Sequence, residues 1–294
     1  MIGIRRILLS FFLVVLGAAI WPLTSLAATD PGLGSAGNYA VLAAATITNT
    51  GPSWITGQLA LSPGTSVTGF PPGTVGHEDI ANGAALNARN AATNAYNVAA
   101  GEPPNSILSS DLGGKTLVPG VYKYTSSGGL TGTVTLDGGG SSTGVWIFQF
   151  GSTLTTATSS RVVLINGAQP CDVFWQVGSS ATIGAATTFV GTILANTSIT
   201  MVTGATLNGR ALAGLIAPSG ALTLDTNRII QASGCGFGVP GYVAPAAGTV
   251  LPATLGVPSE LVSEVPWLLL IAVGSGIAAV TLGIRSRRRR RSNA

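Results

Sequence analysis

The chain has 294 residues, of which 46% are hydrophobic and only 8% are charged. Soluble surfaces are typically about a quarter charged or more, so small polar groups must cover most of this one. The formal net charge of +4 is misleading: eight of the fourteen basic residues lie in the two ends of the chain, and six basic against ten acidic residues remain, a balance near −4. The part between the ends therefore lacks the basic patch that nucleic-acid binding requires.

The first 28 residues have the order of a secretory signal peptide. Arg5 and Arg6 precede the apolar run ILLSFFLVVLGAAIW, and the small residues of TSLAA follow it. This order predicts a signal peptide at 1–28 that is removed near Ala27 or Ala28 on export. An uncleaved membrane anchor is the alternative, although the run is shorter than the ~20 residues that a membrane span needs.

Residues 29–235 alternate between two kinds of short apolar segment, which predicts a mostly β domain. Bulky segments such as GVWIFQF (144–150) alternate with small, threonine-rich segments such as TSITMV (197–202). From residue 172 onward, corresponding points recur roughly every 16 to 24 residues, which is typical of a solenoid. Two strands per repeat, joined by Gly/Ser corners, favour a right-handed parallel β-helix. An antiparallel sandwich of short strands is the alternative.

One alanine-rich segment, at about 78–100, breaks the strand pattern and predicts a helix. Glu78 and Asp79 are expected in its first turn, where negative charge suits the helix dipole, and Gly101 with Pro103 is expected to end it. Small side chains at three- and four-residue spacing predict that the helix packs closely on a flat surface. These stripe residues are Ile80, Ala84, Ala88, Ala91, Ala95 and Ala99.

The sequence offers no recognisable set of catalytic or metal-binding residues. His77 is the only histidine, and the chain has neither a GxSxG motif nor a carboxylate pair spaced for sugar cleavage. We interpret His77 as a surface or capping residue and expect no enzyme activity, no metal and no cofactor. In an exported chain, Cys171 and Cys235 favour a disulfide, with two separate buried thiols as the alternative.

The C-terminal part predicts a linker followed by a membrane anchor. Residues 236–264 are rich in Pro, Gly and Ala without periodicity, as in a flexible tether. The apolar run at 265–284 is long enough to span a bilayer, and the basic tail at 285–294 is expected on the cytoplasmic side, which would place the domain at the cell surface. LPATLG (Leu251–Gly256) resembles a sortase sorting signal with an inserted leucine, so wall attachment is the alternative to a retained membrane helix.

The threonine-rich segments place hydroxyls opposite buried apolar residues, because side chains alternate between the two faces of a strand. Ordinary exposed strands also carry Lys and Glu, which are missing here. Stacked rungs ~4.8 Å apart, with alternate residues ~6.7 Å apart along each strand, would form one flat, uncharged face of hydroxyl and methyl groups. The candidate residues of this face are Thr46, Thr48, Thr133, Thr135, Thr153, Thr155, Thr182, Ser198, Thr200 and Thr223.

Several long motifs in order, from about Leu33 to Ile230, resemble the microbial ice-binding protein family. They include GNYAVLAAATITNTGPSWITGQLALSPGTSVTGF, LVPGVYKYTSSGGLTGTVTLDG and CDVFWQVGSSATIGAATTFVGTILANTSIT. The resemblance implies a right-handed, discontinuous β-solenoid of triangular section with a long helix alongside. It also implies an ice crystal surface as the partner, bound through the ten candidate residues, and we expect a monomer. A cell-surface adhesin that binds polysaccharide or protein on the same scaffold is the alternative.

Overall fold

In the computed structural model, residues 27–232 are described. The chain divides into two compact units, Met1–Ala244 and Pro245–Ala294, and every described residue belongs to the first. The predicted linker (236–264), membrane span (265–284), basic tail (285–294) and sorting-like motif lie outside the described residues, as does nearly all of the signal peptide. Within 27–232, no helix has the length and apolar character to cross a membrane.

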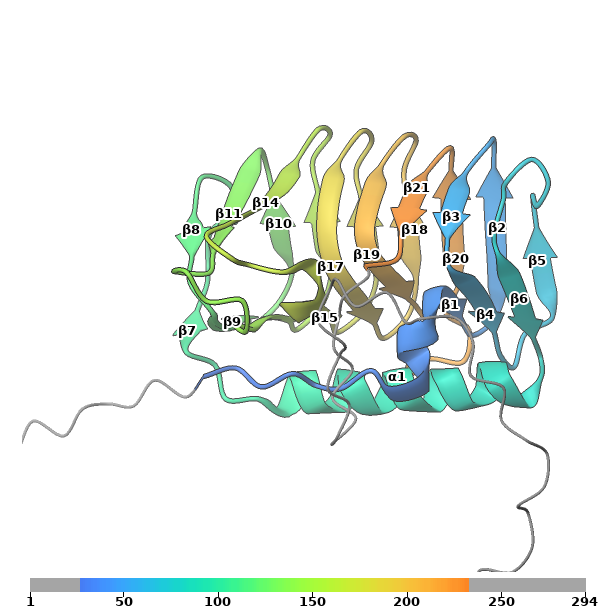
Figure 1. The fold of residues 1–294 in the computed structure, drawn as a ribbon, viewed down its shortest axis with the longest axis horizontal. Helices are drawn as coiled ribbons and strands as arrows, with labels where there is room; N and C mark the ends of the chain where they lie inside the picture. Colours follow the sequence, from blue (N-terminus) through green and yellow to red (C-terminus); the bar gives the residue numbers. More distant parts are fainter. Residues whose placement is uncertain (1–26, 233–294) are drawn as a thin grey trace, which may run out of the picture. The chain divides into compact units, whose positions relative to one another are not determined.

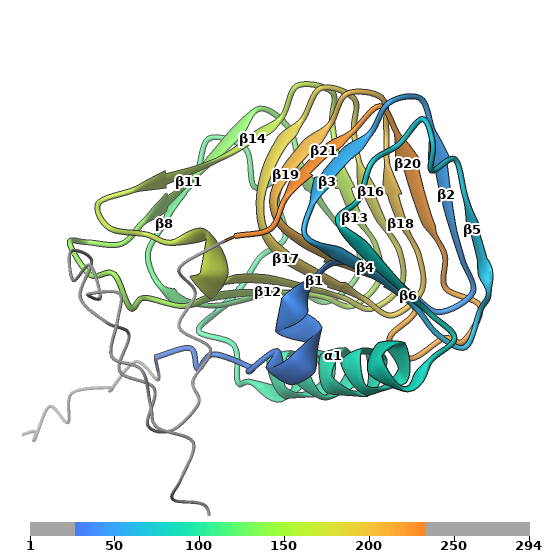
Figure 2. The same ribbon diagram turned by 45° about the vertical axis from the view of Figure 1, so that its right-hand side comes forward.

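The fold is the predicted discontinuous parallel β-solenoid with one long helix alongside it, seen in Figures 1 and 2. The chain coils through three faces, and neighbouring strands on each face pair in parallel. The hydroxyl face is a seven-stranded sheet, in the order β10 (Gly128–Leu130), β13 (Leu154–Thr156), β16 (Ala181–Ile183), β18 (Ile199–Met201), β20 (Leu222–Asp225), β2 (Thr46–Thr50) and β5 (Ser66–Thr68).

The other two faces belong to one continuous sheet. The helix face runs in the order β6 (His77–Ile80), β4 (Gln58–Leu61), β1 (Tyr39–Ala43), β19 (Thr206–Leu212), β17 (Thr188–Ala195), β15 (Val173–Val177), β12 (Trp146–Phe150), β9 (Gly120–Tyr124) and β7 (Ser106–Ile107). The arginine face contains β8 (Thr116–Leu117), β11 (Thr133–Asp137), β14 (Arg161–Ile165), the first halves of β17 and β19, β21 (Arg228–Ile230) and β3 (Trp54–Thr56).

Two long strands, β17 and β19, each cross from the arginine face to the helix face, so the prediction of two strands per repeat was incomplete. The bend falls at Gly191 and Gly209, where φ is positive. The two glycines stack, and a Cβ on Gly209 would lie only 2.0 Å from the carbonyl oxygen of Gly191. One bulky sequence segment therefore forms strand on two faces of the solenoid.

The chain does not wind in sequence order. Strands β1 to β6 build one end of the solenoid, the helix α1 (Gly83–Gly101) carries the chain along its length, and the strands from β7 onward wind back (Figure 1). The two parts meet where β1 pairs with β19, β2 with β20 and β3 with β21. This junction makes the solenoid discontinuous, and it places a seam within each face.

The interior is filled by side chains that stack from coil to coil. The rings of Tyr122, Phe148, Trp175 and Phe189 form a column with centroid separations of 5.5, 4.2 and 4.7 Å. Phe148, Trp175 and Phe189 are fully buried, and each contributes about 1.5–3 kcal/mol of hydrophobic stabilisation. This column explains the aromatic residues that recur in the bulky segments.

The helix α1 begins at Gly83, five residues later than predicted. His77–Ile80 pairs instead with β4 from Gln58 to Leu61, so Glu78 and Asp79 lie in the strand β6 and not in the first helical turn. Asn82 caps the helix, because its Oδ1 accepts a hydrogen bond from the amide of Ala85 at 2.9 Å. Pairing with β4 thus prevents residues 77–80 from joining the N-terminal end of the helix.

The helix packs closely on the helix face, as its small stripe predicted. Its fully buried alanines contact Leu42, Leu194 and Leu212, which are in register on neighbouring strands. Within the predicted stripe, Ala84 is exposed and Ala91 is half-buried, while Ala85 and Ala92 are buried in their place. The remaining buried helix residues are Ala88, Ala95, Tyr96 and Ala99.

Two other predictions concern single side chains. Cys171, in the short 3-10 helix η2 (Pro170–Asp172), is disulfide-bonded. Cys235 lies outside the described residues, so the Cys171–Cys235 pairing stays a prediction. His77 is an exposed residue of β6, 3.5 Å from the carboxylate of Asp79.

Candidate functional site

Of the three faces, the hydroxyl face has the fewest bulky and charged side chains in the open. The helix face is covered by α1. The arginine face carries the exposed side chains of Arg161 and Arg228, and the Arg228 guanidinium lies 4.7 Å from the ring centre of the half-exposed Trp54. The hydroxyl face instead presents rows of small side chains to solvent.

Six threonines form a continuous central row across the hydroxyl face. Strand pairing aligns the six threonines directly with one another, one per strand, so that neighbours are ~4.8 Å apart and the row is roughly 24 Å long. In order, the row is Thr155, Thr182, Thr200, Thr223, Thr48 and Thr68. We call this set the central row.

The central row ends at β10, where Gly129 stands in place of a threonine. A loop crosses here, held by Asp111, whose Oδ1 accepts hydrogen bonds from the amides of Thr131 and Gly113 at 2.8 and 2.7 Å. A Cβ on Gly129 would lie 3.0 Å from this carboxylate. The loop therefore closes one end of the hydroxyl face.

The hydroxyls of the central row are nearly all available to solvent. Only Thr48 and Thr223 interact with each other, with their Oγ1 atoms 3.5 Å apart. Among residues 27–232, no protein group hydrogen-bonds the side chains of Thr155, Thr182 or Thr200. Each threonine is β-branched and stiff about χ1, so the positions of its hydroxyl and methyl group are fixed by the strand beneath it.

A flanking row two residues earlier in each strand has a different role, because several of its hydroxyls bond neighbouring rungs. Thr153 Oγ1 donates to Ser127 Oγ at 2.8 Å. Ser198 Oγ accepts from the amide of Ala221 at 3.1 Å, and Ser180 Oγ accepts from the amide of Ser198 at 3.3 Å. These contacts tie the coils together and leave less of each hydroxyl free.

On the opposite edge, two residues after the central row, the side chains are mostly small. Ala157, Gly184 and Val202 directly follow the strands β13, β16 and β18, and Asp225, the last residue of β20, carries the charge of this edge. Asp225 is held by the hydroxyls of Thr203 and Thr226. The charge therefore lies at the margin and not in the central row.

The central row lies on a rigid floor. On five of the six strands, the residue that precedes the row threonine is fully or almost fully buried, and these residues pair in the order Leu154, Ala181, Ile199, Leu222 and Ile47. On the sixth strand, β5, Val67 pairs with Ile47 and is partly buried. Close packing of this floor resists displacement of any one rung. The arrangement offers a fixed lattice of hydroxyl and methyl groups and no titratable group at its centre.

The structure brings together eight of the ten predicted residues. Thr48, Thr155, Thr182, Thr200 and Thr223 lie in the central row, and Thr46, Thr153 and Ser198 lie in the flanking row. Thr133 and Thr135 do not join them: β11 pairs with β14 and β8 on the arginine face, where Thr133 is opposite Arg161. Their prediction as members of the same face was wrong, because alternation separates inward from outward residues but does not assign a strand to a face.

Sequence reasoning missed Ser66 and Thr68, which are exposed and extend the face onto β5. The motif SVT at 66–68 has the same alternation as the other hydroxyl strands, so the signal was present. Its short length, between prolines and glycines, concealed it.

The chain belongs to the Ice-binding-like family, whose model matches residues 41–230. It is 43% identical over 270 residues to an ice-binding protein of Nostoc sp. (strain HG1), covering 90% of each chain. It is 36% identical over 216 residues to an ice-binding protein of Flavobacterium frigoris (strain PS1), covering 67% of this chain and 75% of that protein.

Solved structures of ice-binding proteins are also similar to this chain. An ice-binding protein from an Antarctic biological consortium is 44% identical with a TM-score of 0.68, covering 72% of this chain and 96% of that one. An ice-binding protein of the Antarctic ascomycete Antarctomyces psychrotrophicus is 40% identical with a TM-score of 0.66, covering 69% and 98%. These matches cover almost the whole of the two solved chains and about 70% of this one. The family is not a class of enzymes.

Proposed function

We propose that this protein binds ice through the central row of the hydroxyl face. The single observation that carries the proposal is the row itself: six threonines in register, with mostly unpaired hydroxyls, on a rigid floor and without charge. Relatives named as ice-binding proteins are 36 to 44% identical to this chain, and the two solved ones share its fold, which supports the same activity here.

The mechanism is adsorption. Hydroxyls at fixed spacing hydrogen-bond water, and the intervening methyl groups order water around them, so the face holds a layer of water whose geometry matches an ice plane. A bound protein pins the crystal at that point, and ice between bound molecules grows as a curved front that needs a lower temperature to advance. No step forms or breaks a covalent bond, and we assign no catalytic role to this chain.

Partition into growing ice tests the proposal on residues 29–235. We expect the protein to concentrate in the ice fraction, to shape single crystals and to slow recrystallisation. Recovery of the folded protein in the liquid fraction, with crystal shape unchanged, would overturn the proposal and favour the adhesin alternative.

We further propose that the chain is exported and that residues 265–284 hold it in the membrane at the cell surface. The support is sequence order: a signal-like start, an apolar run and a basic tail. Mass spectrometry of the mature protein tests this directly. An intact C-terminus in the membrane fraction is expected, whereas cleavage after Thr254 would show wall attachment instead.

A further inference from the structure

The exposed basic side chains of residues 27–232 lie together on one face. This part of the chain contains six lysines and arginines, and among them only Arg161 and Arg228 are exposed. Both belong to the arginine face, in the strands β14 and β21. Since the domain carries so few charges, an anionic partner would be attracted to this face before the other two.

Strand pairing places the two arginines in one row across the face. Their strands are three rungs apart, a separation of roughly 14 Å at a rung spacing of ~4.8 Å. The other members of the row are uncharged, so hydroxyl groups separate the two cations. In order, the row is Trp54, Arg228, Thr206, Thr188, Arg161 and Thr133. We call this set the arginine row.

Both guanidinium groups of the arginine row are available to a partner. Neither forms an ion pair with a carboxylate of residues 27–232. Arg228 instead lies 4.7 Å from the ring centre of Trp54, and stacking on an indole holds a guanidinium in place while its N–H donors stay free. Asp137, at the far end of β11, already accepts hydrogen bonds from Gly139 and Asn166.

A second row lies two residues further along the same strands and is partly apolar. It includes the half-buried Ile230 and Asn208, which pair with each other, and the exposed Val163. Alternate residues of a strand point to the same side, so these side chains lie beside the arginine row. The face therefore combines cations, hydroxyls and an amide with apolar groups.

These features narrow the chemistry of a partner. Arginine binds a carboxylate through two parallel N–H···O bonds, threonine and asparagine bond to hydroxyl groups, and Ile230 and Val163 can contact C–H groups. A chain of acidic sugars presents all three kinds of group, and one rung is close to the length of one sugar unit in an extended polysaccharide. Recognition of an anionic membrane generally takes about four to eight basic residues, more than the two here.

We propose that the arginine row binds a strand of acidic polysaccharide, with Arg161 and Arg228 each holding a carboxylate. The polymer lies across the strands, along the solenoid. The central row is on a different face, so this binding does not depend on the proposed ice binding. A molecule that does both holds polysaccharide on one face and ice on another.

Biolayer interferometry on immobilised polygalacturonate tests the proposal. The protein is the full chain in a polyoxyethylene detergent, which has neither charge nor a sugar headgroup. The basic tail would itself bind a polyanion, so the reference chain carries Arg285→Ser, Arg287→Ser, Arg288→Ser, Arg289→Ser, Arg290→Ser and Arg291→Ser. We expect the reference chain to bind polygalacturonate but not dextran, a neutral polymer. Binding should disappear at about 1 M salt, where the Debye length is ~3 Å.

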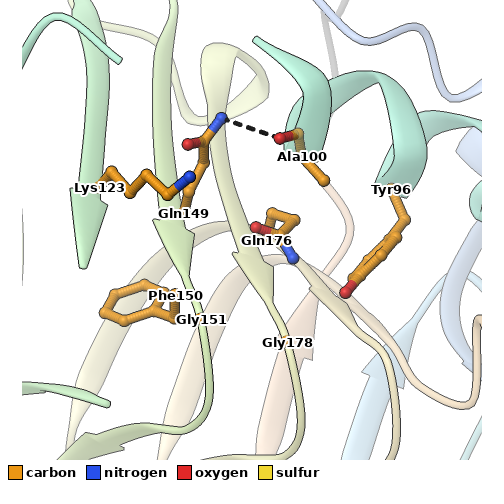
Figure 3. A pocket seen from close by; sticks show the side chains of 8 residues that line it. All are labelled: Tyr96, Ala100, Lys123, Gln149, Phe150, Gly151, Gln176 and Gly178. Carbon is orange, nitrogen blue, oxygen red and sulfur yellow. Dashed lines mark hydrogen bonds between the residues drawn. The ribbon is translucent and has the colours of Figure 1, made fainter. Parts of the chain in front are cut away.

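Substitutions in the reference chain localise the site. Arg161→Gln and Arg228→Gln should each weaken binding about fivefold, the upper range for an exposed ion pair. The two positions are distant, so their effects should multiply to about 25-fold in the double variant. Lys123→Gln is the matched control: it removes the same charge from the helix face, beside Gln149 (Figure 3), and should bind like the reference chain.

The proposal fails if the reference chain does not bind polygalacturonate at ~0.1 mM protein, a concentration suited to Kd values of ~1 mM or tighter. Equal losses in Lys123→Gln and Arg161→Gln would show that net charge alone drives adsorption. Equally strong binding to poly-L-glutamate or to phosphatidylglycerol vesicles would assign the row to an acidic peptide or a membrane instead. Ice partition of the arginine variants should match that of the reference chain, so either proposal can fail without the other.

Discussion

Thr200 lies near the middle of the central row, in register with Thr182 on one side and Thr223 on the other. Its hydroxyl has no protein partner in the described region, and its methyl group is held by the same Cβ. Serine at this position would keep the hydroxyl but lose the methyl and the stiffness of a β-branched side chain. Thr200 thus supplies one fixed hydroxyl and one fixed methyl group to the central row, and its effect on ice binding depends on the threonines beside it.

The substitution Thr200→Tyr should abolish ice binding and leave the fold intact. A phenol ring projects beyond the neighbouring side chains and would hold the face away from a flat crystal. Ice partition and crystal shape report the loss, and circular dichroism reports the fold.

Thr133→Tyr is the matched control, since Thr133 is an exposed strand threonine on the arginine face. It should bind ice like the wild type. Equal loss in both variants, or no loss in Thr200→Tyr, would show that the hydroxyl face is not the surface that contacts ice.

Asp172, beside the disulfide-bonded Cys171, should make stability depend on pH. Burial, assisted by the nearby Asp30 carboxylate, raises the pKa of Asp172 to about 6. The folded state therefore holds this proton more tightly than the unfolded chain, and the associated stability is present at pH 4 and lost as pH rises through about 6.

Asp172→Asn should remove this dependence. We expect the variant to be about 1 kcal/mol more stable than the wild type at pH 7.5, a value discounted from the full shift because the carboxyl is part-exposed. Denaturant unfolding at a series of pH values measures the difference. Parallel curves for the two proteins between pH 4 and 7.5 would contradict the assignment.

At the scale of elements, alternation in the sequence identified the strands and their inward residues. Ile47, Leu154, Ile199 and Leu222, which alternate with the candidate hydroxyl residues, are buried, as alternation predicts. Alternation does not show on which of the three faces of the solenoid a strand lies. A bend such as the one at Gly191 can carry a single segment across two faces. For this reason the sequence places Thr133 on the hydroxyl face, whereas its strand β11 lies on the arginine face.

The beginning of α1 was misplaced for a related reason. Acidic residues at 78 and 79 suit a helix start locally, but pairing of His77–Ile80 with β4 is a long-range contact that local propensity does not register. Asp79 instead accepts hydrogen bonds from Tyr39 and Asn82, at 2.7 Å each. These bonds hold the pKa of Asp79 below its usual range.

Removal of the helix cap should destabilise the fold without affecting the hydroxyl face. Asn82→Ala leaves the amide of Ala85 without its acceptor, at a cost of about 1 kcal/mol in the free energy of unfolding. Denaturant unfolding measures it. Asn87→Ala, at an exposed position inside the helix, is the control and should be neutral or slightly stabilising. Equal stability of the two variants would show that the cap contributes nothing.

At the scale of the molecule, the lack of charge in the central row predicts how ice binding responds to solvent. Coulombic binding weakens as salt screens it, with a Debye length of ~10 Å at 0.1 M and ~3 Å at 1 M. Adsorption through hydroxyl and methyl groups should keep its apparent affinity between low and high salt, and between pH 5 and 9. Surface adsorption of labelled protein on ice, corrected for the colligative effect of salt, measures this. A steep fall with salt would point to the arginine face instead.

The repeat period predicted a solenoid, but only the resemblance to a known family implied that it would be discontinuous. A period describes neighbouring turns of chain. It carries no information about pairs such as Thr48 and Thr223, which are 175 residues apart in the sequence and adjacent in the central row.

That distant pairing has a consequence for the order in which the protein can be made. The strand that joins the two parts of the hydroxyl face, β20, is the last of the seven strands of that face to be synthesised. Until it arrives, the early strands have no partner on that side, and such non-local closure is slow. A nascent chain, or a chain truncated before β20, therefore holds two short fragments of the central row and never the whole row. The complete central row can form only once β20 pairs with β18 on one side and β2 on the other.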